Sequence, residues 1–414
     1  MKLTGGHPPW GALHTGTIPQ YPRLEKDICC DVLVIGSGIS GALAAYVLTK
    51  QGADVAVLEK KCISSGSTSA NTGLLQFMND DSLNELIGRF GERKGTGFYG
   101  MCRDAINRLA SIAGELASDV DFRRRSSLYY ATMDEDAGMI RNEYDTLIRH
   151  GFEVEYWDRD RIKSKFPFSR SAAIYTKNDA EVNPYKLTLA LLSSAAAKGL
   201  KIFEHSCAKQ VKYSEKGAIV QTAHGSVYAN TLIWALGYET QEWKPDKSAS
   251  LECTYAIMTE PIPDLSFWHE RALIWETNRP YLYMRTTPDN RVIAGGLDEP
   301  VPKSGRPKDR LAGYAQKLIN EIRDHFPDLV DLRAEYSWCG LFGYTRDGIP
   351  LIGRHPRFPH SYFIEGYGGS GTVYSMIAAD LLAQAASGIE PEELSWFSLT
   401  RSFNMDPRST AQRQ

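Results

Sequence analysis

Paired cysteines and clustered histidines are missing from this 414-residue sequence. Its seven cysteines include no CxxC pair, and its nine histidines form neither HxH nor HExxH. An odd number of scattered cysteines indicates reduced thiols, which favours a cytoplasmic protein over a disulfide-stabilised secreted one. Because the usual ligand patterns are missing, we expect no metal site.

Long apolar segments and an excess of basic charge are missing as well. No stretch of about 18 residues is apolar enough to form a transmembrane helix. The first residues, MKLTGGHPPWGALHTG, lack the apolar region of a secretory signal. With a net charge of −3, the sequence gives no reason to expect nucleic acid as a partner. Its length and ordinary hydrophobic content predict a globular protein with two lobes.

The strongest motif present is DVLVIGSGISGALAAYVLTKQGADVAVLEKK, residues 31–61. Its pattern predicts a strand, a helix and a second strand at 32–35, 42–50 and 54–58. The glycines between the first strand and the helix follow the spacing G-x-G-x-x-G. A complete unit of this kind is typical of dinucleotide-binding domains.

The three glycines of this unit and the glutamate after its second strand each have a physical role. Gly36 permits the tight turn, Gly38 lets the backbone approach a pyrophosphate, and Gly41 lets the helix pack closely on the strand. The helix directs its free N–H groups and positive dipole end at the phosphates. Glu59 follows the second strand, where a carboxylate can accept hydrogen bonds from an adenosine ribose. An acid at this position disfavours NADP, but the motif leaves FAD and NAD open.

A second run, EGYGGSGTVYS, repeats the glycine spacing at residues 365–375. A strand at 362–364 precedes it and a helix over 372–386 follows. After that helix comes SGIEPEELSW, which contains neither a buried strand nor a terminal acid. Because half a unit cannot hold a second dinucleotide, we predict one nucleotide site and a different role for this run.

The region between 251 and 297 has another pattern. Its short apolar runs, TYAIMTE, YLYMR and RVIAGG, are separated by turns without intervening helices. Such spacing predicts an antiparallel sheet. Nucleotide-type and antiparallel segments therefore alternate, and we predict an α/β fold in which a Rossmann-like domain is interleaved with an antiparallel-sheet domain.

The segment KKCISSGSTSANTGLLQF, residues 60–77, resembles the FAD-dependent oxidoreductases related to D-amino-acid oxidase and glycine oxidase. Its pattern is closest to their amine-oxidising, gamma-glutamylputrescine oxidase-like branch. Gly66, Asn71 and Gly73 match that branch's G-x-S-G-R-N-G-G loop, with Thr68 at the serine and Ala70 at the arginine. TLIWALGYET at 231–240 and DGIPLIGRHP at 347–356 resemble later family segments, so the likeness spans about residues 28–390.

This resemblance implies a discontinuous FAD-binding domain and a substrate-binding domain. The FAD-binding domain would comprise 28–95, 173–247 and 336–400, and the substrate-binding domain 96–172 and 248–335, after an N-terminal arm at 1–27. The second glycine run would lie against the pyrimidine edge of the flavin, where helix N–H groups stabilise negative charge. Cys339 is one place from the position of covalent attachment in some relatives, which implies non-covalent FAD.

Together the first motif and the resemblance give the predicted FAD-binding residues. They are Gly36, Ser37, Gly38, Ile39, Ser40, Gly41, Glu59, Lys60, Ser67, Thr68, Asn71, Thr72, Gly73, Ala208, Ala235, Gly237, Gly366, Gly368, Gly369, Ser370, Gly371 and Thr372.

The resemblance also implies oxidation of a small-molecule amine or amino acid at its C–N bond, with hydride passing to flavin N5. Phe342, in WCGLFGYTRDG, stands where amino-acid oxidases of the family place a carboxylate-binding arginine. Arg285 is a possible replacement clamp or a surface residue. Tyr283, which shares a strand face with Tyr281, either covers the substrate or packs in the core.

Several alternatives stay open at this point. The same fold could oxidise a hydroxy acid or polyol, a single nucleotide domain could serve an NAD-linked dehydrogenase, and the chain could bind flavin without catalysis. The electron acceptor is O2 or another molecule. Ile293 stands where some oxidases of the family have a lysine, which favours another acceptor. The sequence leaves the oligomeric state open.

Overall fold

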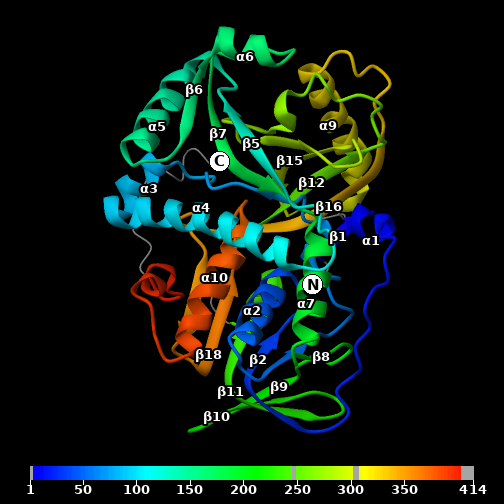
Figure 1. The fold of residues 1–414 in the computed structure, drawn as a ribbon, viewed down its shortest axis with the longest axis vertical. Helices are drawn as coiled ribbons and strands as arrows, with labels where there is room; N and C mark the ends of the chain where they lie inside the picture. The colour runs from blue at the N-terminus through cyan, green and yellow to red at the C-terminus, as the bar shows by residue number, and fades with distance from the viewer. Residues whose placement is uncertain (1–2, 245–248, 302–306, 402–414) are drawn as a thin grey trace.

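A computed structural model of the protein describes residues 3–244, 249–301 and 307–401, so small parts of the predicted ranges, at 1–2, 245–248 and 302–306, lie outside it. The described chain forms two lobes, each built around one large sheet. Figure 1 shows the ten-stranded sheet in the upper half and the eight-stranded sheet in the lower half. Helix α4 (Glu92–Glu115) runs between them and packs on elements of both lobes.

The lower sheet has the order β17-β18-β11-β2-β3-β8, and β10 and β9 extend it from β11. Its five central strands, β18 (Phe358–Glu365), β11 (Ser226–Trp234), β2 (Ile28–Ile35), β3 (Val55–Leu58) and β8 (Lys201–Phe203), run parallel. The antiparallel strands are β17 (Leu351–His355), β9 (Gln210–Ser214) and β10 (Gly217–Gln221). The predicted strand at 32–35 is therefore central, which explains its continuous apolar sequence.

Three helices pack together on one side of this sheet: α2 (Ile39–Lys50), α7 (Pro184–Ala196) and α10 (Gly371–Ala386). α2 follows β2, and α10 follows β18, as the two glycine runs predicted. Because parallel strands end at the same edge of a sheet, both helices begin at that edge. The N-termini of two helices thus face the space between the lobes.

The upper sheet has the order β1-β16-β12-β15-β14-β13-β5-β7-β4, with β6 paired to β7. The strands are β1 (Thr4–Gly6), β4 (Leu74–Leu75), β5 (Arg123–Tyr130), β6 (Val154–Asp158), β7 (Ala172–Glu181), β12 (Ala249–Thr259), β13 (Leu273–Glu276), β14 (Leu282–Thr286), β15 (Val292–Pro300) and β16 (Ala334–Thr345). All described pairs are antiparallel except β13 with β5. The predicted combination of a Rossmann-like sheet with an antiparallel sheet is confirmed.

The remaining helices surround the upper sheet: α1 (Pro9–Leu13), α3 (Leu83–Phe90), α5 (Ala137–Arg149), α6 (Arg159–Lys165) and α9 (Leu311–His325), while the short α8 (Thr240–Trp243) follows β11. α3 begins after Ser82, which forms a reciprocal capping box with Glu85. α9 covers one face of the sheet and forms a separate core with it, while the opposite face turns toward the lower lobe.

Strand pairing divides the chain differently from the predicted domain limits in four places. β4, β7 and part of β16 fall in ranges predicted for the FAD-binding domain, yet all pair in the upper sheet. β1, from the predicted arm, extends the same sheet beside β16. The exact domain limits remain a prediction, but these strands carry the chain across from one lobe to the other.

Candidate functional site

A cavity of about 530 Å³ lies between the two lobes. The strand ends and helix starts of the lower sheet form one wall, and residues of β12–β16 form another. All predicted FAD-binding residues line it except Gly41 and Gly73. Both glycine runs therefore border one cavity, as expected for a single site.

The first glycine run forms a cradle in which side chains cannot fit. Gly36 has φ +105°, and a Cβ there would lie 2.4 Å from the Ala235 carbonyl oxygen. At Gly41 a Cβ would lie 1.9 Å from the carbonyl oxygen of Gly36. Gly41 thus acts below the surface of the cavity, by letting α2 approach the turn.

Glu59 lines the cavity at the end of β3 and braces the glycine turn. Its Oε2 accepts hydrogen bonds from the backbone N–H and hydroxyl of Ser37, at 3.1 and 2.8 Å. Its Oε1 accepts one from Lys61 N at 2.8 Å. Since each carboxylate oxygen has more than one acceptor position, Glu59 can still accept hydrogen bonds from ribose hydroxyls.

The side chain of Lys60, a residue also predicted to bind the cofactor, forms an ion pair with Glu239. Its Nζ lies 2.7 and 2.6 Å from the two carboxylate oxygens of Glu239, which belongs to the turn after β11. Both residues line the cavity. Their ion pair joins the ends of β3 and β11 beside Glu59.

The loop 66–73 is fixed by hydrogen bonds to three successive backbone carbonyls. Trp338 Nε1 donates to Ala70 O at 2.8 Å, Trp10 Nε1 to Asn71 O at 2.7 Å, and Arg285 Nε to Thr72 O at 2.7 Å. The donors come from β16, α1 and β14. Neither tryptophan could be predicted from the sequence, because a hydrogen bond between an indole and a carbonyl far along the chain leaves no local pattern.

The predicted role of Arg285 as a substrate clamp is corrected by its surroundings. Only 2% of the residue is exposed, and it is not among the residues that line the cavity. Besides Thr72, its guanidinium donates to the carbonyls of Val182 and Thr286 and lies 3.5 Å from the Glu181 carboxylate. Its donors are thus committed to the protein, where they position the loop before Gly73.

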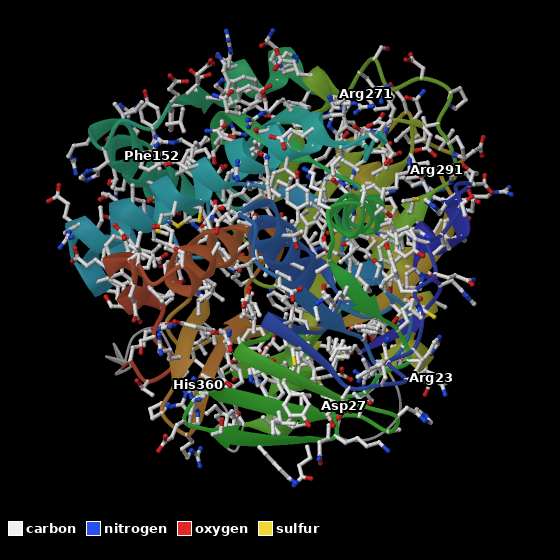
Figure 2. All side chains as sticks on the ribbon, turned by 60° about the horizontal axis from the view of Figure 1, so that its bottom comes forward. Arg23, Asp27, Phe152, Arg271, Arg291 and His360 are labelled. Atoms are coloured by element: carbon white, nitrogen blue, oxygen red, sulfur yellow. The ribbon has the colours of Figure 1, made fainter. Side chains whose placement is uncertain are left out.

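Two other arginines of the same lobe are also hydrogen-bonded to protein groups outside the cavity. Figure 2 labels Arg271 and Arg291 in the upper right part of the view. Arg271 donates to Asn290 Oδ1 at 2.5 Å, and Arg291 donates to Asp289 at 2.7 Å. Both stabilise the 287–290 turn and lie outside the cavity lining.

The second glycine run meets the first through the starts of the two helices. Ser375 Oγ lies 2.7 Å from Ser40 Oγ, and Thr372 Oγ1 accepts a hydrogen bond from Asn71 Nδ2 at 3.1 Å. Gly368 has φ +116°, which favours glycine at that position. The N–H of Gly369, a predicted flavin contact, donates to Asp80 Oδ2 at 3.0 Å. Asp80 is a cavity residue that the sequence analysis missed.

These features fit a bound dinucleotide such as FAD. The glycine turn admits a close ligand, and two helix N-termini supply positive dipole ends at one edge. Ser67, on the cavity wall, has a buried hydroxyl without a hydrogen-bond partner among the described residues. An unpaired donor beside such a cradle suits a phosphate oxygen.

The wall opposite the glycine runs is aromatic. Trp275 and Tyr283 line the cavity and pair with each other across β13 and β14. Their row continues across the upper sheet through Gly295 and Ala256 to Trp338, which does not line the cavity. Gly295 leaves room for the Tyr283 ring, because a Cβ at residue 295 would lie 2.3 Å from the Tyr283 hydroxyl. Burial raises the pKa of Tyr283 to about 12, so its hydroxyl is a neutral hydrogen-bonding group.

Phe342 lies on the same face of the sheet, two residues beyond Gly340, and lines the cavity as predicted. The family of the protein identifies the cofactor that this cavity would bind. A family model described as DAO, FAD dependent oxidoreductase, matches residues 31–385. The chain belongs to this family.

Relatives of this FAD-dependent oxidoreductase are similar over most of their length. Gamma-glutamylputrescine oxidoreductase of Escherichia coli (strain K12) is 25% identical over 376 residues, covering 89% of this chain and 86% of that protein. The crystal structure of glycine oxidase from Geobacillus kaustophilus superposes with a TM-score of 0.79 at 22% identity, covering 91% of this chain and all of that one. L-alpha-glycerophosphate oxidase from Mycoplasma pneumoniae, with FAD bound, has a TM-score of 0.70 at 13% identity, covering 92% and 97%.

Membership of the family settles the cofactor. The enzyme is an FAD-dependent oxidoreductase, so the choice between FAD and NAD that the first glycine motif left open is decided for FAD. Within the described part of the chain, no helix is long and apolar enough to cross a membrane. The same residues contain no cluster of three or more groups that could hold a metal ion.

Replacing Thr68 by valine tests the hydrogen bond between the loop and the first helix. Thr68 Oγ1 accepts from the first N–H of α2, at Ile39, over 2.9 Å, and its side chain is 5% exposed. Valine keeps the shape but leaves that buried N–H unpaired, which costs about 1–3 kcal/mol. We expect a lower melting temperature and roughly tenfold weaker FAD binding, measured by thermal unfolding and by titrating FAD into the deflavinated protein. Thr96→Val, whose hydroxyl donates only within α4 and lies outside the cavity lining, is the control and should bind FAD like the parent.

Proposed function

We propose that this enzyme oxidises the C–N bond of an amine or amino acid. FAD, when bound, supplies the acceptor for the substrate's hydride at flavin N5. Residues of the chain then have to bind the substrate against that ring, exclude water and hold the reacting C–H bond in line. The aromatic wall formed by Trp275, Tyr283 and Phe342 faces the cavity opposite the glycine runs, which suits this task.

The observation that carries the proposal is the charge of the cavity lining. Lys60 and Lys61, which follow Glu59 at the end of β3, are the only cations among the described residues of the lining. The carboxylate of a hydroxy acid or of an amino acid, like a phosphate ester, would need a cation beside the aromatic wall, so within the proposed class the lining favours amines. An amine needs none. The Escherichia coli relative, gamma-glutamylputrescine oxidoreductase, supports the same choice.

Oxidation of a hydroxy acid or polyol is the alternative. It is favoured by the fold shared with L-alpha-glycerophosphate oxidase. Because a polyol carries no charge, the cavity lining alone does not separate it from an amine. Only the product of the reaction distinguishes the two.

Anaerobic mixing with a panel of small molecules tests the proposed function. We expect amines or amino acids to bleach the visible flavin absorbance with release of ammonia, or of an amine fragment, and an aldehyde or keto acid. Bleaching only by hydroxy acids or polyols would overturn the proposal. Dithionite should bleach the protein in every case and serves as the control for bound flavin. A protein that dithionite reduces but no panel member does would be a flavin-binding module instead.

The mode of FAD binding and the electron acceptor follow as further proposals. Cys339, 3% exposed, points into the core beneath the upper sheet and does not line the cavity. This supports non-covalent FAD, which acid precipitation should release into the supernatant. Ile293 is fully buried and supplies no charge to the cavity, which supports an acceptor other than O2.

A further inference from the structure

An irregularity in β15 determines which side chain enters the cavity. On β12, Cys253 pairs with Glu299 and Tyr255 with Gly296, so β15 has one more residue than its partner across this interval. The extra residue forms a β-bulge, and Leu297 within it has φ +56°. Bulges of this kind redirect side chains and are common beside active sites.

The bulge exchanges the two faces of the strand. Before it, Val292 and Ala294 belong to the core beneath α9, and Ile293 faces the other way. Continued alternation would place residue 298 in that core. Instead Leu297 packs against the core, and Asp298 lines the cavity. The strand therefore adopts a costly left-handed residue and, in doing so, presents a carboxylate to the cavity.

One atom in each of two polar side chains of this wall has no hydrogen-bond partner among the described residues. The Oδ1 atom of Asp298 is buried without a hydrogen bond. Trp275, only 5% exposed, has an Nε1–H that no described acceptor reaches. Both residues line the cavity. An unsatisfied acceptor and an unsatisfied donor facing one cavity indicate that a polar ligand completes them.

The groups around Asp298 are mainly aromatic or acidic. Tyr238, Tyr281 and Tyr283 line the cavity and feel the charge of this carboxylate. The other groups that face it are Thr254, Asp80, Glu252 and Arg279. Thr254 donates a hydrogen bond to it, and Glu252 is itself hydrogen-bonded by Tyr344.

Arg279 is the one cation in that set, and it is turned away from the cavity. Its guanidinium lies 5.1 Å from the centre of the Tyr281 ring and donates to the backbone carbonyls of Asp80 and of its own turn. It is not part of the cavity lining. Asp298 is therefore a carboxylate beside several aromatic rings without a cation paired to it among the described residues.

We propose that this wall of the cavity binds the substrate as a cation, with the Asp298 carboxylate as its counter-ion and the tyrosine rings around the charged group. Aromatic faces attract ammonium groups, and a carboxylate that is partly removed from water binds them strongly. The inference rests on the proposed function and narrows it. The substrate class becomes an amine that binds as its ammonium ion, and no carboxylate on the substrate is needed for recognition. A reacting ammonium passes its proton to the Asp298 carboxylate before the hydride leaves, because only the neutral amine can form the C=N bond.

The ionisation of Asp298 gives this proposal a pH dependence. Burial, with a smaller contribution from Asp80 and Glu252, raises the pKa of Asp298 to about 7, against the opposing effects of Thr254 and Arg279. The carboxylate is thus mostly neutral below that pH and charged above it. Binding of a permanent cation should strengthen as the pH rises through about 7.

Calorimetric titration of the flavin-loaded enzyme with tetramethylammonium tests the proposal. This probe keeps its charge at every pH and cannot be oxidised through an N–H group. We expect about tenfold tighter binding at about pH 8 than at about pH 6, as the fraction of ionised Asp298 changes. Asp298→Asn should bind at least about tenfold more weakly at the higher pH and show no pH dependence. Asp298→Glu should restore both.

Glu260→Gln is the matched control, because Glu260 is an exposed carboxylate at the end of the same strand β12 that carries Thr254. It should bind the probe like the parent enzyme. Equal binding by the parent and by Asp298→Asn, or parent binding that does not change with pH, would overturn the proposal. If Asp298→Asn loses its flavin or unfolds, the pH dependence of the parent enzyme still decides.

Failure of this inference can be told from failure of the proposed function. The titration measures binding without turnover, whereas flavin bleaching measures oxidation. Amine-driven bleaching that is indifferent to Asp298→Asn would leave the proposed function standing and overturn only the counter-ion. Cation binding by Asp298 in an enzyme that no amine reduces would overturn the proposed function alone.

Discussion

Replacing Gly41 by alanine is expected to abolish FAD binding. The added Cβ would lie 1.9 Å from the carbonyl oxygen of Gly36, 3.0 Å from its carbonyl carbon and 3.3 Å from Val34 Cγ1. Two of these atoms are backbone, and Gly36 is itself fixed, because Ala235 O lies close behind it. α2 must therefore move away from the turn, and the helix N-terminus moves with it. Overpacking of this kind costs about 1–3 kcal/mol or more.

The measurement for Gly41→Ala is the flavin content of the purified protein, together with its thermal unfolding. We expect flavin content to fall by at least about tenfold and the melting temperature to drop by several degrees. Gly100→Ala, inside α4, is the matched control, since a Cβ there meets nothing within 4 Å. That change should leave flavin content unaltered and stabilise the helix by up to about 1 kcal/mol. Full flavin content in Gly41→Ala would contradict the close packing at this turn.

Replacing Arg285 by methionine should destabilise the whole enzyme. Methionine fills the space but leaves the carbonyls of Thr72, Val182 and Thr286 without their donor. Glu181, fully buried, keeps only its ion pair with Arg125 at 2.8 Å. Breaking a buried charged network in this way costs about 3–5 kcal/mol. Since Thr72 belongs to the loop at the cavity, FAD affinity should fall as well.

Denaturant unfolding of the flavin-loaded protein measures this effect. Arg354→Met is the control, because its partner Glu390 lies 3.8 Å away and both side chains are more than half exposed. The control should lose less than about 1 kcal/mol. If Arg285 were instead a substrate clamp, Arg285→Met would unfold like the parent enzyme and raise KM for carboxylate-bearing substrates alone. That outcome would support the original prediction that Arg285 binds a substrate carboxylate.

The cofactor half of the site could be predicted from the sequence because its chemistry is local. A strand, a glycine turn and a helix follow each other within residues 31–61, and the turn itself is the part expected to approach the phosphates. The second run, residues 365–375, has the same local order. Both glycine runs follow parallel strands of the same sheet, and parallel strands end at one edge. The two runs must therefore lie at that edge.

The substrate half could not be predicted because it depends on register and on contacts between distant segments. Regular alternation would place Asp298 in the core, and only the bulge at Leu297 reverses its face. Two of the candidates from the sequence, Tyr283 and Arg285, lie two residues apart on the same strand. The structure separates their roles. Tyr283 lines the cavity, whereas Arg285 is buried and donates to carbonyls in the loop before Gly73 and at the end of β7.

Flavin stoichiometry tests most directly whether both glycine runs enclose one FAD. The parent protein should contain one FAD per chain, released by acid and quantified against the protein. Gly368→Val should lose nearly all of it, because φ there is +116° and a Cβ would lie 2.9 Å from the Tyr374 ring. A full complement of FAD in Gly368→Val, or two nucleotides bound per chain of the parent protein, would contradict the account.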